Sequence, residues 1–378
     1  MEDIKMTDQK AQYAQHKPEL DAAFSAAMER MMQENSPLVD DFASKVAGYL
    51  GARHVFPCAN GTDALQIALA ALDLPAGAEV IMPAFGDAAG AEAVKLLGLK
   101  PVFADVLPDT YMLDPAAVEK AATPGTVAIM PVHLFGHCAP MHELLSLAAR
   151  HSLFVVEDNT QSLGAVYVGP EGQEAKAGSL GHISATAFFP AKPLAGTGEG
   201  GAVITSDAAL AENIGRITRN EQQEGAEPER LYIKSPLDPL QAAMQEVKLK
   251  YIESYNSARR EVAHFYDKAF AETVLVQAPH RAPYSSHTYQ QYTITVNPKL
   301  RDGLQEHLRR QHIPSVVYYP QPLHLQEPFA YLGYKAGDFP VSERLSESVL
   351  SLPMHPRLKE DQLAYICQHL LNYVKQHD

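Results

Sequence analysis

The 378-residue sequence contains only three cysteines, Cys58, Cys138 and Cys367. Their spacing matches neither a disulfide framework nor a set of metal ligands, so we expect free thiols in a reducing compartment. The sequence also lacks an apolar run long enough to span a bilayer, and residues 1–20 are too polar to hold the apolar segment of a signal peptide. These absences predict a cytoplasmic protein with no membrane partner.

Positive charge is scarce as well. The chain has 31 Lys and Arg residues against 45 Asp and Glu, a net charge of −14 at pH 7, and no cluster of basic residues. Nucleic acids and anionic membranes repel such a chain, so we expect neither as a partner. Because 46% of the residues are apolar, the chain can bury a full core, and its length predicts about two or three domains.

Apolar, strand-like segments alternate with segments of helical periodicity. Strands are expected within residues 78–85, 100–106, 126–135, 151–159, 182–189 and 201–207, and helices within 61–72, 90–98, 114–122 and 139–151. This alternation predicts an α/β fold with βαβ crossovers and a mostly parallel, doubly wound sheet. Ligands of such sheets bind at the carboxyl ends of the strands.

The periodicity changes after one long helical pattern at residues 237–270. An alternating stretch at 287–296, a helical pattern at 300–312 and an apolar stretch at 315–320 follow it. These segments predict a smaller α+β domain. We therefore divide the chain into a large domain, residues 1–245, and a small C-terminal α+β domain, residues 246–378.

Two stretches of the large domain offer groups that could bind a cofactor. In "ANGTDAL", small residues lead into a helix whose first N–H groups could bind a phosphate, with a hydroxyl from Thr62. A plain helix cap at Asn60 or Thr62 explains this stretch equally well. In "VVEDNTQSLGA", a buried strand ends in Glu157 and Asp158. Asp158 could hold a proton on a heteroaromatic nitrogen, or it could cap the next segment.

Lys192 lies between an apolar strand and the glycine-rich stretch "GTGEGG". A solvated loop position is the usual fate of a single lysine. Here, however, a phosphate loop, a strand-end acid and a lysine follow one another along the chain. They match the anchor, the pyridinium partner and the Schiff-base lysine that pyridoxal 5'-phosphate (PLP) requires.

Several motifs are similar, in order and spacing, to those of one known family. They are "CANGTDALQIAL", "VHLFGHCAPM", "VVEDNTQSLGA", "FFPAKPL", "GEGGAVITSD" and "SLPMHPRL". The chain resembles the DegT-type sugar-nucleotide aminotransferases, which have the PLP-dependent transferase fold type I, from about Asp40 to the C-terminus. Within this family, the sequences of its motifs are most similar to those of the branch that aminates a 3-keto group on UDP-2-acetamido-3-oxo-uronic acid.

The resemblance implies a function and partners. It implies PLP-dependent transamination of a keto sugar nucleotide, with glutamate as amino donor, giving an amino sugar for surface polysaccharide or related glycans. It also implies a homodimer whose active sites are shared between the subunits. No metal is implied.

Roles for cofactor-binding residues follow from the resemblance. Lys192 would form the Schiff base and shuttle protons, and Asp158 would pair with the pyridine nitrogen. Gln161 would lie near the 3-hydroxyl of the cofactor. Gly61 and Thr62 would hold its phosphate.

The resemblance also assigns the segment that reaches the sugar nucleotide. Tyr318, Tyr319 and His324 would lie in this segment, although alternating aromatic residues of a strand often pack instead. Arg219 and Arg230 could contact an anion, or they could be ordinary solvated arginines.

At several positions the sequence departs from the family pattern. Ala187 replaces a serine that binds the cofactor phosphate, and Ser184 or Thr186 could supply a hydroxyl nearby. Gly86 and Asp87 replace a threonine and an aromatic residue that stacks on the pyridine ring. These departures predict a phosphate site with one donor fewer and a different contact to the ring.

Another departure concerns the neighbouring subunit. Lys234 stands where the family offers an asparagine to the phosphate of the partner's site, and Pro236 stands where it has an arginine. A lysine could still neutralise the phosphate as a point charge. We therefore keep two alternatives to an active aminotransferase. One is a sugar-nucleotide or PLP-binding module without catalysis, against which the retained Lys192, Asp158 and Gln161 argue. The other is a PLP-dependent sugar dehydratase, in which a histidine would replace the lysine.

Overall fold

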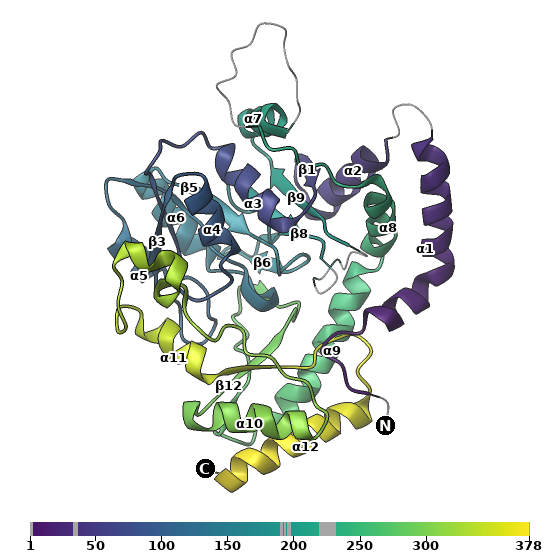
Figure 1. Ribbon diagram of the computed structural model, residues 1–378, viewed down its shortest axis with the longest axis vertical. Coiled ribbons are helices and arrows are strands. Elements are labelled where there is room, and N and C mark those ends of the chain that lie inside the picture. Colours follow the sequence, from purple (N-terminus) through teal and green to yellow (C-terminus); the bar gives the residue numbers. More distant parts are fainter. Residues whose placement is uncertain are drawn as a thin grey trace, which may run out of the picture.

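Seven strands form the central sheet (Figure 1). The computed structural model describes residues 3–32, 37–189, 192, 194, 198–218 and 232–377. In spatial order the strands are β1 (His54–Cys58), β9 (Gly201–Thr205), β8 (Ile183–Ala187), β5 (Phe154–Asp158), β4 (Thr126–Ile129), β2 (Glu79–Pro83) and β3 (Lys100–Ala104). All neighbouring pairs from β8 to β3 are parallel, and β9 is antiparallel to both of its neighbours. The predicted mostly parallel sheet is confirmed.

Helices cover both faces of this sheet. Side chains of a strand alternate between the two faces, so Val80 and Met82 of β2 belong to one core and Ile81 to the other. The first core includes residues of α3 (Gly61–Ala70), α4 (Ala89–Leu96) and α7 (Ala208–Thr218), and the second includes residues of α5 (Pro115–Ala121) and α6 (Met141–His151). The sheet is therefore doubly wound, with apolar strands buried on both sides.

Another sheet, which is antiparallel, lies near the C-terminal helices. It consists of β10 (Val276–Gln277), β12 (Tyr292–Val296) and β13 (Val349–Leu352). Its core includes residues of α9 (Ile252–Phe270), α10 (Pro298–Arg310) and α12 (Glu360–His377), drawn in green and yellow in Figure 1. Ile4 joins this core, so the N-terminal segment packs against the C-terminal part of the chain. The division at residue 245 stays a prediction.

The remaining elements lie around these two sheets. They are α1 (Gln9–Met31), α2 (Leu38–Leu50), α11 (Pro340–Ser348), the short strands β6 (Val166–Val168), β7 (Glu174–Lys176) and β11 (Ser285–Ser286), and the 3₁₀ turns η1 (Leu134–Gly136), η2 (Leu323–Leu325) and η3 (Glu327–Leu332). All three cysteines are buried and free. Among the residues that the structure describes, no helix is both long and apolar enough to cross a lipid bilayer.

The long helical pattern at residues 237–270 forms two helices instead of one. They are α8 (Pro239–Leu249) and α9, and a break separates them at Lys250 and Tyr251. There the Tyr251 N–H donates to the Lys248 carbonyl, three residues back, at 3.0 Å. This tighter turn ends α8, and apolar periodicity in the sequence does not detect it. α1 packs against α8 through Leu20.

Candidate active site

Asp158 is the last residue of β5, between β4 and β8 in the middle of the sheet. The residue is only 5% exposed. The Thr160 N–H donates to Asp158 Oδ1 at 3.0 Å, so the carboxylate caps the turn that follows the strand. Burial raises the pKa of Asp158, while the hydrogen bonds from Thr160 and the positive charge of Lys192 oppose the rise. A buried carboxylate thus lies at the carboxyl edge of the sheet, as predicted.

Lys192 follows β8, the strand next to β5, and its side chain is partly buried. Its backbone N–H donates to the Phe189 carbonyl at 2.8 Å. Burial lowers the pKa of the Lys192 amine, and the charges of Asp158 and Asp87 oppose this shift. Each of the two groups thus shifts the pKa of the other. The structure therefore brings the predicted lysine and carboxylate into one electrostatic neighbourhood.

The start of α3 packs tightly against the ends of β8 and β9. Asn60 caps the helix, because its side-chain oxygen accepts a hydrogen bond from the Asp63 N–H at 2.8 Å. A Cβ atom on Gly61 would lie 2.7 Å from Cβ of Ala187. One on Gly201 would lie 2.4 Å from the Asn60 carbonyl oxygen. Only glycine allows this approach, so backbone N–H groups of the helix start lie directly beside Ala187.

This packing predicts the effect of a single methyl group. We expect Gly201→Ala to lower the free energy of unfolding by about 1–3 kcal/mol, because the new Cβ would overlap the backbone of Asn60 and force the helix start to move. Denaturant titration measures this loss. Gly215→Ala in α7 is the matched control, since no atom lies within 4 Å of its added Cβ and alanine favours the helix. Equal stabilities of the two variants would contradict the tight contact.

Gln161 links the turn after β5 to an aromatic cluster. Its Oε1 accepts a hydrogen bond from the Phe135 N–H at 3.0 Å, and its Nε2 donates to the Tyr319 hydroxyl at 3.1 Å. The rings of Phe135 and Tyr319 stack at 6.3 Å, and Phe85 contacts Tyr319 edge-on at 6.0 Å. Burial and the charge of Asp87 raise the pKa of Tyr319, so the phenol stays protonated at neutral pH. Tyr319 thus lies in the same neighbourhood as Asp158 and Lys192.

A second buried polar group supports this edge of the sheet. Glu157 accepts hydrogen bonds from the backbone N–H groups of Gly178, Leu180 and Gly181, at 2.6–2.8 Å. His133 Nδ1 accepts from the Ala139 N–H, so its Nε2 carries the proton and donates to Glu157 at 2.7 Å. His133 and Glu157 lie in the motifs "VHLFGHCAPM" and "VVEDNTQSLGA", and the sequence gives no signal of their pairing. Their role is to hold the loops on either side of Asp158.

Ser184, a predicted contact of the cofactor phosphate, and His324, a predicted contact of the sugar nucleotide, both pair with other groups of the protein. Ser184 donates to the Gly178 carbonyl at 2.6 Å, and Ala187, three residues further along β8, points to the opposite face against Gly61. Ser184 therefore does not reach the α3 start. His324 is buried in η2, where it pairs with Glu343 at 3.1 Å and packs on Phe339 at 4.7 Å. These contacts connect η2 to Phe339 and to Glu343 at the start of α11.

The other predicted residues differ in their burial and in their hydrogen bonds. Tyr318 is partly buried, and burial raises its pKa. Asp87 is exposed and accepts a hydrogen bond from the Ala89 N–H at 2.9 Å, at the start of α4. Thr186 donates to the Asn159 carbonyl at 3.1 Å. Thr62 follows Gly61 at the first turn of α3 and is partly exposed.

Lys234 is exposed, next to the α3 start of its own chain. The adjacent Ser235 carbonyl accepts a hydrogen bond from the Ala59 N–H at 3.1 Å, and Pro236 forms a β-bridge with Cys58. Arg219 and Arg230 lie outside the described residues. An open cavity of about 580 Å³ borders this region, and it is lined by Phe24, Ala59, Glu199, Pro236, Asp238, Leu240, Gln241 and Met244.

Comparison with known proteins agrees with this geometry. The profile of the DegT/DnrJ/EryC1/StrS aminotransferase family matches residues 14–371. A solved structure of a DegT/DnrJ/EryC1/StrS aminotransferase from Brucella abortus superimposes with a TM-score of 0.89 at 38% identity, covering 98% of this chain and 99% of the other.

Two curated relatives also match over almost their full length. The chain is 37% identical to the UDP-2-acetamido-2-deoxy-3-oxo-D-glucuronate aminotransferase of Pseudomonas aeruginosa, covering 98% of this chain and 100% of the relative. It is 39% identical to a protein of Geobacillus stearothermophilus named pleiotropic regulatory protein, covering 98% of this chain and 99% of the relative.

Proposed function

The chain belongs to the DegT/DnrJ/EryC1/StrS aminotransferase family, and we propose that it uses PLP to transfer an amino group from glutamate to a keto sugar nucleotide. One observation carries the proposal. At the carboxyl edge of the sheet, the partly buried Lys192 and the buried Asp158 are close enough for each charge to shift the pKa of the other. The start of α3 lies at the same edge, where the contact of Gly61 with Ala187 leaves no room for a side chain larger than that of glycine. A binding module without catalysis has no physical need for this combination of groups.

The residues present fit PLP. Its phosphate would lie at the start of α3, where Gly61 and Thr62 offer backbone N–H groups and a hydroxyl. The tight contact among Gly61, Ala187 and Gly201 supports this placement, because it keeps side chains away from the helix start. Gln161 would lie at the 3-hydroxyl of the cofactor, as predicted from the resemblance.

PLP supplies an electron sink that stabilises negative charge at the carbon bearing the transferred amine. Asp158 would hold a proton at the pyridine nitrogen, and its cap on the Thr160 N–H fixes the orientation of its carboxylate. Lys192 Nζ would move a proton to and from the reacting carbon. Because burial lowers the pKa of Lys192, a larger fraction of this amine is neutral and able to accept a proton at neutral pH.

The substrate class follows from the relatives. The P. aeruginosa relative is named as an aminotransferase of a UDP-linked 3-oxo sugar acid. By similarity we propose a nucleotide-linked 3-keto sugar, with a UDP-2-acetamido-3-oxo-uronate as the first candidate. Tyr318 and Tyr319 would contact this sugar nucleotide, and the link from Tyr319 to Gln161 supports a place next to the cofactor. The product would be an amino sugar for glycan biosynthesis.

We further propose a cytoplasmic homodimer with shared active sites. Phe24, Met28, Met31 and Met32 form a row of exposed apolar side chains in the C-terminal half of α1 and at the residue that follows it. Such a row is typical of a surface that another molecule covers. Phe24 also lines the open cavity beside Ala59, so a second subunit on this face would lie next to the α3 start.

A coupled assay tests the proposed activity. The purified protein with PLP is incubated with glutamate and the candidate UDP-3-oxo sugar acid, and formation of 2-oxoglutarate and of the amino sugar is followed. Amino transfer to this sugar or to another keto sugar nucleotide is the expected result. A protein that binds the sugar nucleotide and PLP without turnover would favour the binding module, and loss of the sugar hydroxyl without amination would favour the dehydratase.

The departures at the phosphate site give a further prediction. If Lys234 of the partner subunit neutralises the phosphate, Lys234→Ala should weaken PLP binding roughly tenfold, increasingly so at low salt, where charge attraction is least screened. Ala187→Ser should tighten binding, because a hydroxyl beside Gly61 would donate a charge-assisted hydrogen bond to the phosphate.

PLP titration of the wild type and both variants measures these effects. Lys120→Ala in α5 is the control for loss of a surface lysine. If Lys234→Ala binds PLP like the wild type and Ala187→Ser gains nothing, the phosphate is held by other groups than those proposed.

A further inference from the structure

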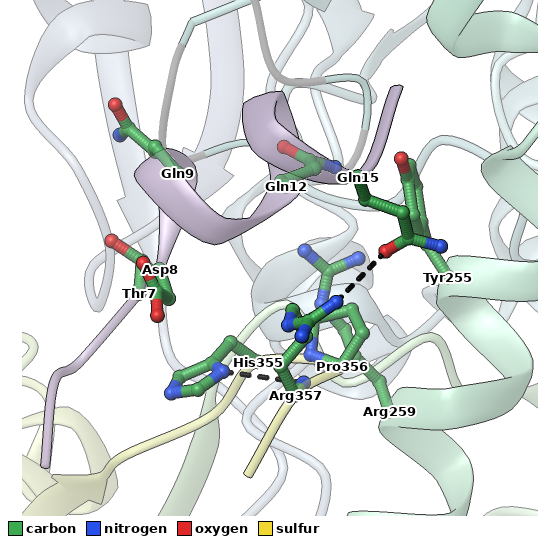
Figure 2. A pocket seen from close by; sticks show the side chains of 10 residues that line it. All are labelled: Thr7, Asp8, Gln9, Gln12, Gln15, Tyr255, Arg259, His355, Pro356 and Arg357. Carbon is green, nitrogen blue, oxygen red and sulfur yellow. Dashed lines mark hydrogen bonds between the residues drawn. The ribbon is translucent and has the colours of Figure 1, made fainter. Parts of the chain in front are cut away.

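A small cavity lies between the N-terminal segment, α9 and the segment before α12, outside the candidate active site (Figure 2). Its volume is about 30 Å³, and its polar lining includes Asp8, Gln12, Tyr255, Arg259, His355 and Arg357. This volume exceeds the roughly 10–15 Å³ that one water molecule needs. Met354 donates its N–H to the Met6 carbonyl at 3.2 Å, so the walls are held together by the backbone.

Arg259 is the buried charge of this cavity. The residue is only 7% exposed, and its Nη1 makes a long hydrogen bond of 3.4 Å to Asn256 Oδ1. Its Nε is buried and has no hydrogen-bond partner among the described residues. Burial lowers the pKa of Arg259 to about 10, so the guanidinium remains protonated at neutral pH. A buried cation without a carboxylate partner is costly, and this cost points to a missing anion.

The other charges around the cavity leave an excess of positive charge. Arg357 lines it as a second guanidinium and donates to Gln15 Oε1 at 3.3 Å. The only acid among the lining residues is Asp8, whose carboxylate pairs with Lys5 at 3.3 Å and accepts from the Ala11 N–H. Two arginines therefore face the same space with one acid that is already neutralised.

The remaining polar lining residues are uncharged at neutral pH. Burial lowers the pKa of His355 to about 4, and its Nδ1 accepts a hydrogen bond from the Arg357 N–H at 3.3 Å. Tyr255 brings a buried hydroxyl from the turn of α9 before Arg259, and Gln12 brings an amide from α1. Hydroxyl, amide and guanidinium groups are all hydrogen-bond donors.

We propose that this cavity binds a small tetrahedral oxyanion, a phosphate group, between Arg259 and Arg357. The guanidinium fork of Arg259 matches two phosphate oxygens, and its unpaired Nε–H becomes a donor to one of them. Arg357 at the exposed rim neutralises a second charge. The bound anion joins α1, α9 and the segment before α12. The phosphate is either inorganic phosphate or the terminal phosphate of a nucleotide.

Isothermal titration of the PLP-saturated protein with inorganic phosphate, at constant ionic strength, tests the proposal. Saturation with PLP keeps the proposed cofactor-phosphate site occupied. We expect Arg259→Gln to weaken phosphate binding roughly tenfold or more, because a charge-assisted pair of hydrogen bonds is lost. Arg357→Gln should weaken it less, because the rim is exposed to solvent. Arg260→Gln, the next residue of α9 and not part of the lining, is the matched control and should bind like the wild type.

A parallel titration with uridine diphosphate distinguishes the two sources of phosphate. If Arg259→Gln binds the nucleotide more weakly and the nucleotide displaces inorganic phosphate from the wild type, the cavity is a nucleotide site. If Arg259→Gln weakens the binding of inorganic phosphate but not of the nucleotide, the cavity is a site for free phosphate. If Arg259→Gln does not fold, Arg357→Gln against Arg260→Gln decides. Absence of phosphate binding to the wild type at millimolar concentration, or equal binding by all variants, would overturn the proposal and leave water as the partner of Arg259.

Discussion

Lys192→Ala is expected to reduce amino transfer by at least about 10³-fold while the fold stays intact. The substitution removes the amine that would bind the cofactor carbonyl and move the proton, and acid–base catalysis by one group contributes roughly 10²- to 10⁴-fold. The backbone N–H of Lys192 donates to the Phe189 carbonyl, and alanine keeps this hydrogen bond. Steady-state kinetics and circular dichroism measure the two effects separately.

Two further variants make this result specific. Lys192→Arg keeps the positive charge near Asp158 but has no neutral amine at neutral pH, so it should be as inactive as the alanine variant. Lys120→Ala, an exposed lysine of α5, should leave the rate unchanged. Borohydride treatment of the PLP-loaded wild type should attach the cofactor to the peptide that contains Lys192. Attachment to another lysine, or turnover by Lys192→Ala close to the wild-type rate, would refute the assignment.

Asp158→Asn is expected to lower the rate by roughly 10²- to 10³-fold with much smaller effects on folding and PLP binding. The amide oxygen of asparagine can still accept the hydrogen bond from the Thr160 N–H, so the turn after β5 is preserved. The negative charge that would keep the pyridine nitrogen protonated is lost. The expected loss is therefore in the rate of the reaction, and a PLP titration beside the kinetic assay separates it from loss of cofactor.

Asp114→Asn is the matched control for this substitution. Asp114 caps α5 in the same way, since its Oδ1 accepts a hydrogen bond from the Ala116 N–H at 2.9 Å. The same change of cap chemistry occurs there at a partly exposed position beside the outermost strand β3, three strands away from β5. We expect unchanged kinetics from Asp114→Asn. If Asp158→Asn is equally active, Asp158 is only a cap, and another group must hold the proton.

The strand pattern explains why Ser184 does not lie beside Gly61. Its closeness to Ala187 in the sequence predicts a substitute donor for the phosphate. Residues three apart on a strand point to opposite faces, so only one of the two can face Gly61, and the structure turns Ala187 toward it. For His324, contact with the sugar nucleotide stays a prediction. The 3₁₀ turn η2 directs its ring toward Glu343 and Phe339, and this local turn has no clear signal in the sequence.

The sequence by itself determined features that depend on near neighbours. The apolar strands of the central sheet, the caps at Asn60 and Asp158, and the order of phosphate loop, acid and lysine all arise from residues close together in the chain. Only the tertiary structure decided which distant groups meet. Strand order places β5 beside β8 and so Asp158 near Lys192, and the tertiary fold brings the start of α1 to the cavity that Arg259 of α9 lines. Long-range pairing sets these contacts, because no local propensity encodes which surfaces exclude water together.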